Sequence, residues 1–287
     1  MCDQDHFDED LQEAEARGLV TRKQFGMILG AGIAMMLPRV ANAAPVTDSD
    51  VNIKTPDGTA DCYFVHPATG TAPGVLMWPD IFGLRPAFRQ MAKRLAESGY
   101  SVLVVNPFYR VMKAPTAEQG AATPIAKVSP LMNALTEQTH MTDAKAFIGW
   151  LDQQPSVAKN KKMGTQGYCM GGPMAFRTAA AMPDRVGAVG SFHGAALVTK
   201  MPNSPHLQAA TSKAQFLIAI ATNDDTRSPT DKDVMKETFA KAGLPAEIEV
   251  YAPAMHGWCP PDTAVYNEPL AEKAWSRLLV LYGKALA

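Results

Sequence analysis

The hydrophobic positions of this chain fall into short blocks that are separated by glycine, proline or polar residues. Gly74–Trp78 and residues 100–105 are continuous apolar runs of strand length, which is typical of strands at the centre of a parallel sheet. Between them, residues 85–98 place apolar side chains at helical spacing, and Gly99 follows as a helix end. The helix-spaced side chains are Phe88, Met91, Ala92 and Leu95. These blocks predict a strand, a helix and a second strand.

The same alternation of strands and helices continues to the end of the chain. Residues 51–55 and 60–66 flank the turn signal Pro56-Asp57-Gly58 and predict an N-terminal β-hairpin. The expected class is α/β with a mostly parallel sheet, in one domain without internal repeats. Further strands are predicted at residues 162–167, 185–192, 216–221 and 246–251. Further helices are predicted within residues 131–153 and at 174–182, 230–242 and 269–286.

The first 43 residues are typical of a leader rather than of a folded domain. After an acidic stretch, Thr21-Arg22-Lys23-Gln24-Phe25 precedes an apolar run over residues 26–37, which is too short for a bilayer span of about 20 residues. Ala41-Asn42-Ala43 follows, as expected for a signal peptide. The leader resembles a twin-arginine export signal in which Lys23 replaces the second arginine. It predicts a mature domain at residues 44–287, periplasmic or secreted and without stable membrane association; the alternative is an N-terminal helix of a cytoplasmic protein.

Composition narrows the possibilities without deciding the function. The 287 residues are 47% hydrophobic and 19% charged, with a formal net charge of -1, so the chain is long enough for one large core. The near-neutral charge gives no electrostatic argument for binding nucleic acid. Cys62, Cys169 and Cys259 of the predicted mature domain have no metal-ligand spacing, and neither a metal nor another cofactor is predicted. One disulfide between Cys62 and Cys259 remains open.

The segment Gly167-Tyr168-Cys169-Met170-Gly171-Gly172 is the strongest candidate for chemistry. It matches G-x-C-x-G, the nucleophile-elbow pattern with cysteine in place of serine. A predicted strand precedes it and a predicted helix follows, which is the context that the pattern requires. Glycines fit here because the turn is strained and the helix packs close to its neighbours. The alternative is an inert, buried cysteine in a glycine-rich turn.

Other reactive side chains follow other predicted strands. Because ligand and catalytic groups gather at the carboxyl ends of parallel strands, Cys169, Asp224 and His256 are expected to meet there. Their order along the chain is that of a nucleophile, acid and base in α/β-hydrolases. Asp224 is preferred to Asp225 as the acid, because Ala221-Thr222-Asn223-Asp224 fits the pattern small-x-x-Asp; Asp225 is then a helix cap. Taken singly, each aspartate fits a turn and the histidine fits a surface position.

Four motifs together resemble the dienelactone hydrolase family over about residues 50–285. They are Asp80-Ile81-Phe82-Gly83, the elbow, Asn223-Asp224 and His256-Gly257-Trp258. The resemblance implies an α/β-hydrolase fold and hydrolysis of a small carboxylic ester or lactone through a thioester. Cys169 would be the nucleophile, His256 the base and Asp224 the residue that orients His256. The backbone N–H groups of Ile81 and Met170 would form the oxyanion hole.

The sequence departs from the family around the expected substrate pocket. Asp80 stands where the family has a glutamate; it would either pair with an arginine or hold the thiol protonated until substrate binds. Arg110 lies where one of two substrate-binding arginines is expected, and no arginine follows His256 closely. These departures leave open a different acyl substrate or a non-catalytic binding protein. The residues implied to line the pocket are Asp80, Phe82, Arg110, Tyr168, His193 and Trp258.

Overall fold

The computed structural model describes residues 37–117, 120 and 123–287, and the single positions 9, 12, 15, 16 and 18. Most of the predicted leader, including its apolar run up to residue 36, therefore lies outside the described residues. The leader and its cleavage remain predictions. In the part of the chain that the structure describes, we find no helix that is both long and apolar enough to cross a membrane.

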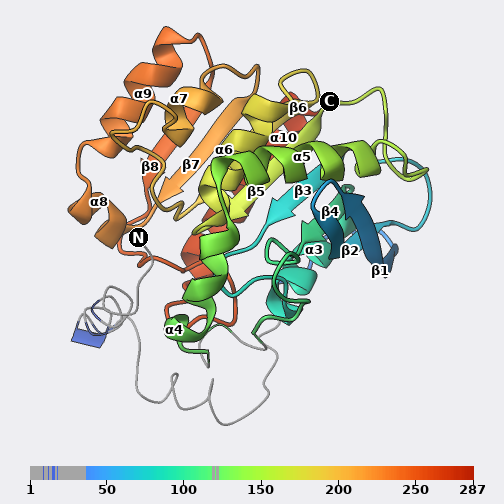
Figure 1. Ribbon diagram of the computed structural model, residues 1–287, viewed down its shortest axis with the longest axis horizontal. Coiled ribbons are helices and arrows are strands. Elements are labelled where there is room, and N and C mark those ends of the chain that lie inside the picture. Colours follow the sequence, from blue (N-terminus) through green and yellow to red (C-terminus); the bar gives the residue numbers. More distant parts are fainter. Residues whose placement is uncertain are drawn as a thin grey trace.

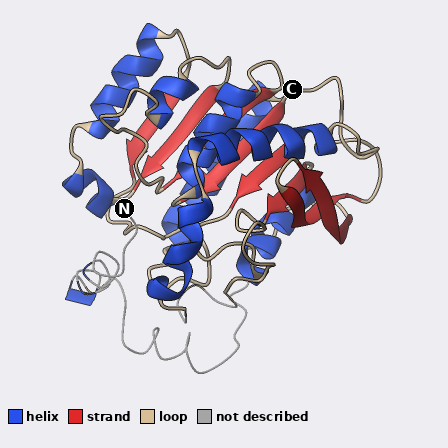
Figure 2. Ribbon diagram, in the orientation of Figure 1, coloured by secondary structure: helices blue, strands red, loops and turns tan. Residues whose placement is uncertain are grey.

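The described residues form one eight-stranded sheet in the order β1-β2-β4-β3-β5-β6-β7-β8 (Figures 1 and 2). The predicted hairpin is confirmed, because β1 and β2 pair antiparallel with Thr55 opposite Gly58. β2 also pairs antiparallel with β4, and all pairs from β4 to β8 are parallel. The strands are β1 (Val46–Thr55), β2 (Gly58–Pro67), β3 (Gly74–Trp78), β4 (Ser101–Val105), β5 (Met163–Tyr168), β6 (Val186–Phe192), β7 (Gln215–Ile220) and β8 (Ala246–Val250).

Helices cover both faces of this sheet, as the α/β prediction requires. α5, α6 and α9 lie on the near face in Figure 1, and α3 and α10 lie behind the sheet. Each face has its own core: Phe147, Phe176 and Phe239 belong to the first, and Phe88 and Tyr282 to the second. The helices are α3 (Pro86–Glu97), α4 (Ile125–Val128), the 3-10 helix η1 (Ser129–Ala134), α5 (Glu137–Leu151), α6 (Gly171–Ala181), α7 (Pro205–Ala209), α8 (Thr222–Arg227), α9 (Asp231–Lys241) and α10 (Glu268–Ala285).

Two short regions differ from the sequence-based expectation. The predicted turn that carries Asp224 is the helix α8, and the segment between β4 and α5 contains α4 and η1. All three helices are too short to show an apolar period in the sequence. α6 also begins at Gly171 instead of Met174, because its first turn consists of the glycines of the elbow.

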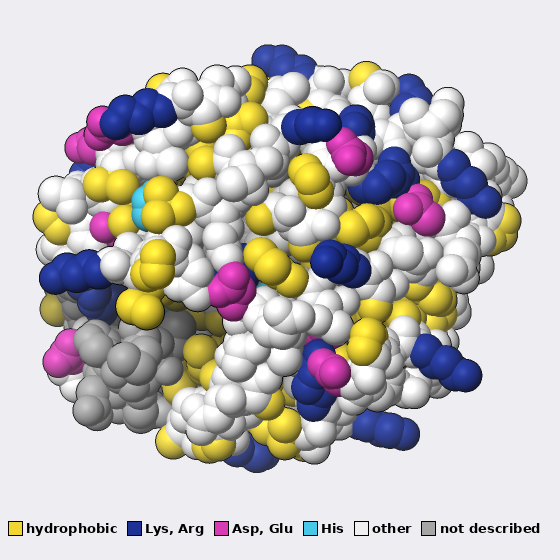
Figure 3. Space-filling view, turned by 45° about the horizontal axis from the view of Figure 1, so that its top comes forward, with side chains coloured by type: hydrophobic (Ala, Val, Ile, Leu, Met, Phe, Trp, Pro, Cys, Tyr) yellow, Lys and Arg dark blue, Asp and Glu magenta, His cyan; other side chains and the backbone are white. Residues whose placement is uncertain are grey.

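Charges of both signs are mixed on the molecular face shown in Figure 3. Lysine and arginine side chains are scattered across this view, and several of them lie beside aspartate or glutamate side chains. The face shown therefore offers no electrostatic signature of a polyanion-binding surface.

Candidate active site

Cys169 occupies a strained turn between β5 and α6. Its φ angle is 53°, in the left-handed region that a residue with a side chain adopts at a cost of roughly 1–3 kcal/mol. Two hydrogen bonds hold this turn against the end of β6: the Cys169 N–H donates to the Phe192 carbonyl at 3.1 Å, and the Ala195 N–H donates to the Cys169 carbonyl at 3.1 Å. The surrounding backbone thus fixes an otherwise unfavourable conformation at the cysteine.

The glycines of the elbow allow backbone segments to touch. A Cβ atom on Gly167 would lie 1.9 Å from the Gly171 carbonyl oxygen, so no larger residue fits there. A Cβ atom on Gly171 would lie 2.5 Å from the Trp78 oxygen and 2.7 Å from the Pro79 oxygen. The close packing that the sequence predicted is therefore confirmed. It also brings the loop after β3, which carries Ile81, against the beginning of α6.

We expect Gly167→Ala to prevent stable folding of the elbow. The overlap is with backbone atoms that cannot rotate away, so the free energy of unfolding should fall by about 3 kcal/mol or more. Gly149→Ala is the matched control, because its Cβ meets no atom within 4 Å in α5. That change should raise the free energy of unfolding by about 0.5–1 kcal/mol. Urea unfolding measures both, and equal stabilities of the two variants would contradict the packing described.

Asp224 and His256 meet at the carboxyl end of the sheet, close to the end of β7. The two Asp224 carboxylate oxygens lie 2.8 and 3.0 Å from Nδ1 of His256. The side chain of Asn223 fixes the same loop, because its Oδ1 accepts from the His256 backbone N–H at 2.8 Å. Asp225 instead binds Lys232 at 2.6 Å. The geometry thus selects Asp224, the preferred aspartate, as the partner of His256.

His193 lies directly beside His256 at the end of β6. Its ring centroid is 5.0 Å from that of His256 and 5.1 Å from that of Trp258, and its φ angle is 40°. The side chain is buried, and neither ring nitrogen has a hydrogen-bond partner among the residues that the structure describes. Burial, and then the neighbouring His256, lower the pKa of His193 well below its ordinary value. His193 is therefore neutral in the folded protein.

Buried neutral histidines make the folded protein sensitive to acid. The unfolded chain protonates these rings below about pH 6.5, so the free energy of unfolding falls as pH drops below that value. His140 contributes to the same loss, because burial lowers its pKa to about 3. We expect His193→Phe to lose less stability than wild type between about pH 7.5 and about pH 5, by roughly 1 kcal/mol per unit below pH 6.5. Urea titrations at both pH values measure this difference, and an unchanged acid loss would contradict it.

Asp80 is paired with an arginine, which was one of its two predicted alternatives. Arg85 binds both carboxylate oxygens, at 2.6 and 2.9 Å, and the Phe82 N–H donates to one of them at 2.9 Å. Burial raises the pKa of Asp80, and the Arg85 guanidinium opposes that rise. The same guanidinium holds Asp262 at 2.6 and 2.8 Å. In this structure both carboxylate oxygens of Asp80 are therefore bound by Arg85.

The contact between Arg85 and Asp262 has no signal in the sequence. Arg85 was expected only as the first residue of a helix, and Asp262 lies 177 residues later, after two prolines. Nothing in either local pattern indicates that the two loops meet. These residues were therefore missed as part of the site.

Arg110 is placed differently from the expected substrate clamp. Its guanidinium binds Asp143 of α5 at 2.7 and 2.8 Å and Asp57 of the hairpin turn at 2.6 Å. Tyr109 also donates to Asp143 at 2.8 Å. In this structure Arg110 therefore joins α5 to the hairpin, and Nε and both Nη atoms of its guanidinium bind protein carboxylates.

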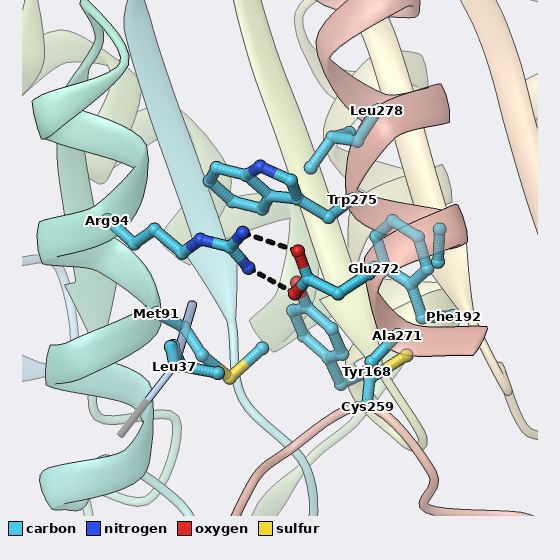
Figure 4. Close-up of a pocket in the computed structure, with 11 residues that line it drawn as sticks. Leu37, Met91, Arg94, Tyr168, Phe192, Cys259, Ala271, Glu272, Trp275 and Leu278 are labelled. Carbon is cyan, nitrogen blue, oxygen red and sulfur yellow. Dashed lines mark hydrogen bonds and ion pairs between the residues drawn. The ribbon is translucent and has the colours of Figure 1, made fainter. Parts of the chain in front are cut away.

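Three further predicted pocket residues are buried among other side chains. Phe82 is covered in the core, and its carbonyl accepts from the Thr116 hydroxyl at 2.7 Å. Trp258 is fully buried and stacks on Tyr251. Tyr168 stacks on Phe192 and lines a separate pocket between α3 and α10, shown in Figure 4. Because successive strand residues point to opposite faces, Tyr168 at the end of β5 faces away from the α5–α6 side.

The structure settles the question of a disulfide between Cys62 and Cys259, which the sequence left open, because no such bond is present. Cys62 and Cys259 are both free and buried, and Cys259 lines the pocket beside Tyr168. Burial raises the pKa of both thiols, which keeps them protonated and unreactive. Within the described residues, no group of three or more His, Cys, Asp and Glu side chains could hold a metal ion.

Comparison with known proteins decides the family. The family model of the dienelactone hydrolase family matches residues 60–286. The chain belongs to this family. Carboxymethylenebutenolidase of Rhodococcus opacus is 29% identical over 256 residues, which cover 85% of this chain and 96% of that protein. As members of this family, the chain and its relatives are carboxylic ester hydrolases.

Solved structures show the same fold at lower identity. A dienelactone hydrolase-like promiscuous phosphotriesterase from metagenomic libraries has a TM-score of 0.69 at 20% identity, covering 84% of this chain and 99% of that one. The dienelactone hydrolase from Anabaena variabilis has a TM-score of 0.58 at 18% identity, with the same coverage. The predicted α/β-hydrolase fold is thus confirmed for this member of the family.

Proposed function

We propose that this dienelactone hydrolase family member hydrolyses a small carboxylic ester or lactone with a Cys169–His256–Asp224 triad. The observation that carries the proposal is the pair of contacts between Asp224 and Nδ1 of His256, at the same end of the sheet as the strained elbow. The relative from Rhodococcus opacus, named carboxymethylenebutenolidase, supports the reaction class. Ester or lactone substrates need no metal or redox cofactor in this mechanism.

Asp224 determines which of the two His256 ring nitrogens carries the proton. A carboxylate at Nδ1 accepts that N–H, so the lone pair of the neutral ring lies on Nε2. Nε2 takes the proton of the Cys169 thiol, and the thiolate attacks the substrate carbonyl carbon. The N-terminus of α6 favours the thiolate, because the helix dipole places partial positive charge there.

The carbonyl oxygen becomes negative when the thiolate adds. We assign the backbone N–H groups of Met170, beside the nucleophile, and of Ile81, in the loop against α6, as its donors. Collapse of this intermediate breaks the ester C–O bond, and the leaving alkoxide takes the proton from His256. The acyl group now forms a thioester with Cys169. His256 then removes a proton from water, which attacks the thioester and releases the carboxylic acid and the thiol.

The direct test is turnover by the purified wild-type protein. We expect hydrolysis of p-nitrophenyl acetate and of at least one small lactone in a panel, well above the rate in buffer alone. Heat-inactivated protein is the control for ester hydrolysis that does not depend on the folded protein. If no ester or lactone is turned over, the proposed reaction is wrong.

A further inference from the structure

The Arg85 side chain near the site is fully hydrogen-bonded. Its Nε and two Nη atoms make five hydrogen bonds, two with Asp80, two with Asp262 and one with the Gly83 carbonyl at 3.3 Å. A guanidinium has five N–H donors, so none is left over. The side chain is also fully covered, with Phe82 and Phe88 against its planar group. Arg85 thus has neither a free donor nor an exposed surface for substrate.

The Arg85 hydrogen bonds connect two loops, and further hydrogen bonds attach a third loop to them. Asp80 belongs to the loop after β3, and Asp262 belongs to the loop that also carries His256. The third loop follows β4: the Gly120 N–H donates to Asp262 at 2.8 Å, and Thr116 donates to the Phe82 carbonyl. Without Arg85, two carboxylates would face each other in a buried place, which is strongly unfavourable.

The Asp80 side chain also shapes the turn that carries Ile81. Its Oδ1 accepts from the Phe82 N–H at 2.9 Å, while its backbone carbonyl accepts from the Gly83 N–H at 2.9 Å. Ile81 is the corner of this turn. Arg85 fixes the carboxylate from the other side, and the preceding carbonyls of Trp78 and Pro79 rest against Gly171 of α6. The direction of the Ile81 N–H therefore depends on where Arg85 holds Asp80.

We propose that Arg85 is a positioning residue that aims the Ile81 N–H at the oxyanion, with Asp262 as its outer anchor. The inference rests on the proposed function, because it concerns the same oxyanion hole. Arg85 acts through Asp80 and the turn, and it does not touch the substrate. Lysine cannot replace it, because an ammonium group cannot bind two carboxylates in a planar, bidentate way.

The test compares Arg85→Lys with Arg94→Lys. Arg94 is the matched control: it lies in α3, the helix that Arg85 precedes as N-cap, and binds Glu272 of α10 with two hydrogen bonds, at 2.5 and 2.6 Å (Figure 4). For each variant, kcat and KM are measured with p-nitrophenyl acetate. The rate of Cys169 alkylation by iodoacetamide is measured as well, because alkylation needs the thiolate but develops no oxyanion. Thermal melting reports on stability.

We expect Arg85→Lys to lower kcat by about 10- to 100-fold, since one oxyanion donor is worth ~10²–10³-fold when removed completely. KM and the alkylation rate should stay within about threefold of wild type, because the interaction acts only in the transition state. Arg94→Lys should keep kcat within about twofold. Equal kcat values for the two variants would overturn the proposal, as would an alkylation rate that falls in proportion to kcat.

If Arg85→Lys does not fold, the same measurements are made on Asp262→Asn instead. It leaves the Arg85–Asp80 pair in place and removes the anchor charge. We then expect kcat to fall about tenfold with unchanged alkylation, as for partial loss of an oxyanion donor; wild-type kcat would overturn the proposal. Failure of the proposed function is distinguishable, because in that case the wild-type protein does not hydrolyse the ester or Cys169→Ala retains the activity.

Discussion

Cys169→Ala is expected to lower the rate of ester hydrolysis by about 10³-fold or more, which is the scale of nucleophile loss in other hydrolases. The alanine side chain cannot form a thioester, and no other nucleophile occupies the strained turn at the end of β5. The fold should survive, because alanine is smaller than cysteine and the elbow is held by backbone hydrogen bonds. Steady-state rates with p-nitrophenyl acetate, together with thermal melting, measure the two effects separately.

Cys259→Ala is the matched control for that result. Cys259 is also a free, buried cysteine, but it lines the pocket between α3 and α10. Its raised pKa keeps it protonated, so the change should leave kcat within about twofold of wild type. If Cys169→Ala stays active, or if Cys259→Ala is the inactive variant, the elbow is not the catalytic centre.

Asp224→Asn is expected to cost about 10³-fold or more in kcat with little change in stability. The amide can present an N–H to Nδ1 of His256, which would stabilise the wrong tautomer and place a proton on Nε2. Nε2 could then no longer accept the proton of the thiol. The loss should appear in kcat and in the alkylation rate of Cys169 alike, because both depend on the thiolate.

Asp225→Asn tests whether this effect belongs to one aspartate. Asp225 neighbours Asp224 in α8, but its carboxylate binds Lys232 near the surface. Its loss should change kcat by less than about threefold, since a partly exposed ion pair contributes little. Comparable losses of kcat in the two variants would show that general destabilisation of α8, and not the contact with His256, limits the rate.

The sheet and the contact between Asp224 and His256 could be predicted because their signals are local. Continuous apolar runs marked β3 and β4, and the glycines around Cys169 marked a turn against which another backbone packs. The chain order of Asp224 and His256 then placed them at the same sheet edge, where the structure shows their contact. Each of these signals lies within a few neighbouring residues of the chain.

The surroundings of the site could not be predicted in this way. Arg110 was expected to face substrate, yet its partners Asp57 and Asp143 come from the hairpin and from α5. Tyr168 and Trp258 belong to the motifs themselves but are buried in the core. Arg85 and Asp262 meet only because two loops fold against the same end of the sheet. Such contacts depend on tertiary placement, which short patterns do not encode.

The occupied arginines have a consequence for substrate charge. Arg85 and Arg110 are both neutralised by aspartates, and the Arg85 cluster contains two carboxylates for one guanidinium. A buried excess of negative charge disfavours an anionic acyl group nearby. Uncharged esters and lactones are therefore the appropriate first substrates for assays of this protein.

The acyl-enzyme intermediate provides the most direct test of the central claim. Wild-type protein is mixed with p-nitrophenyl acetate, quenched in acid within the first turnover, and digested for mass spectrometry. We predict one acetyl group on the peptide that contains Cys169, which hydroxylamine removes and which is absent from Cys169→Ala. An acetyl group on another residue, or a burst of p-nitrophenolate without acetylated Cys169, would contradict thioester catalysis by this triad.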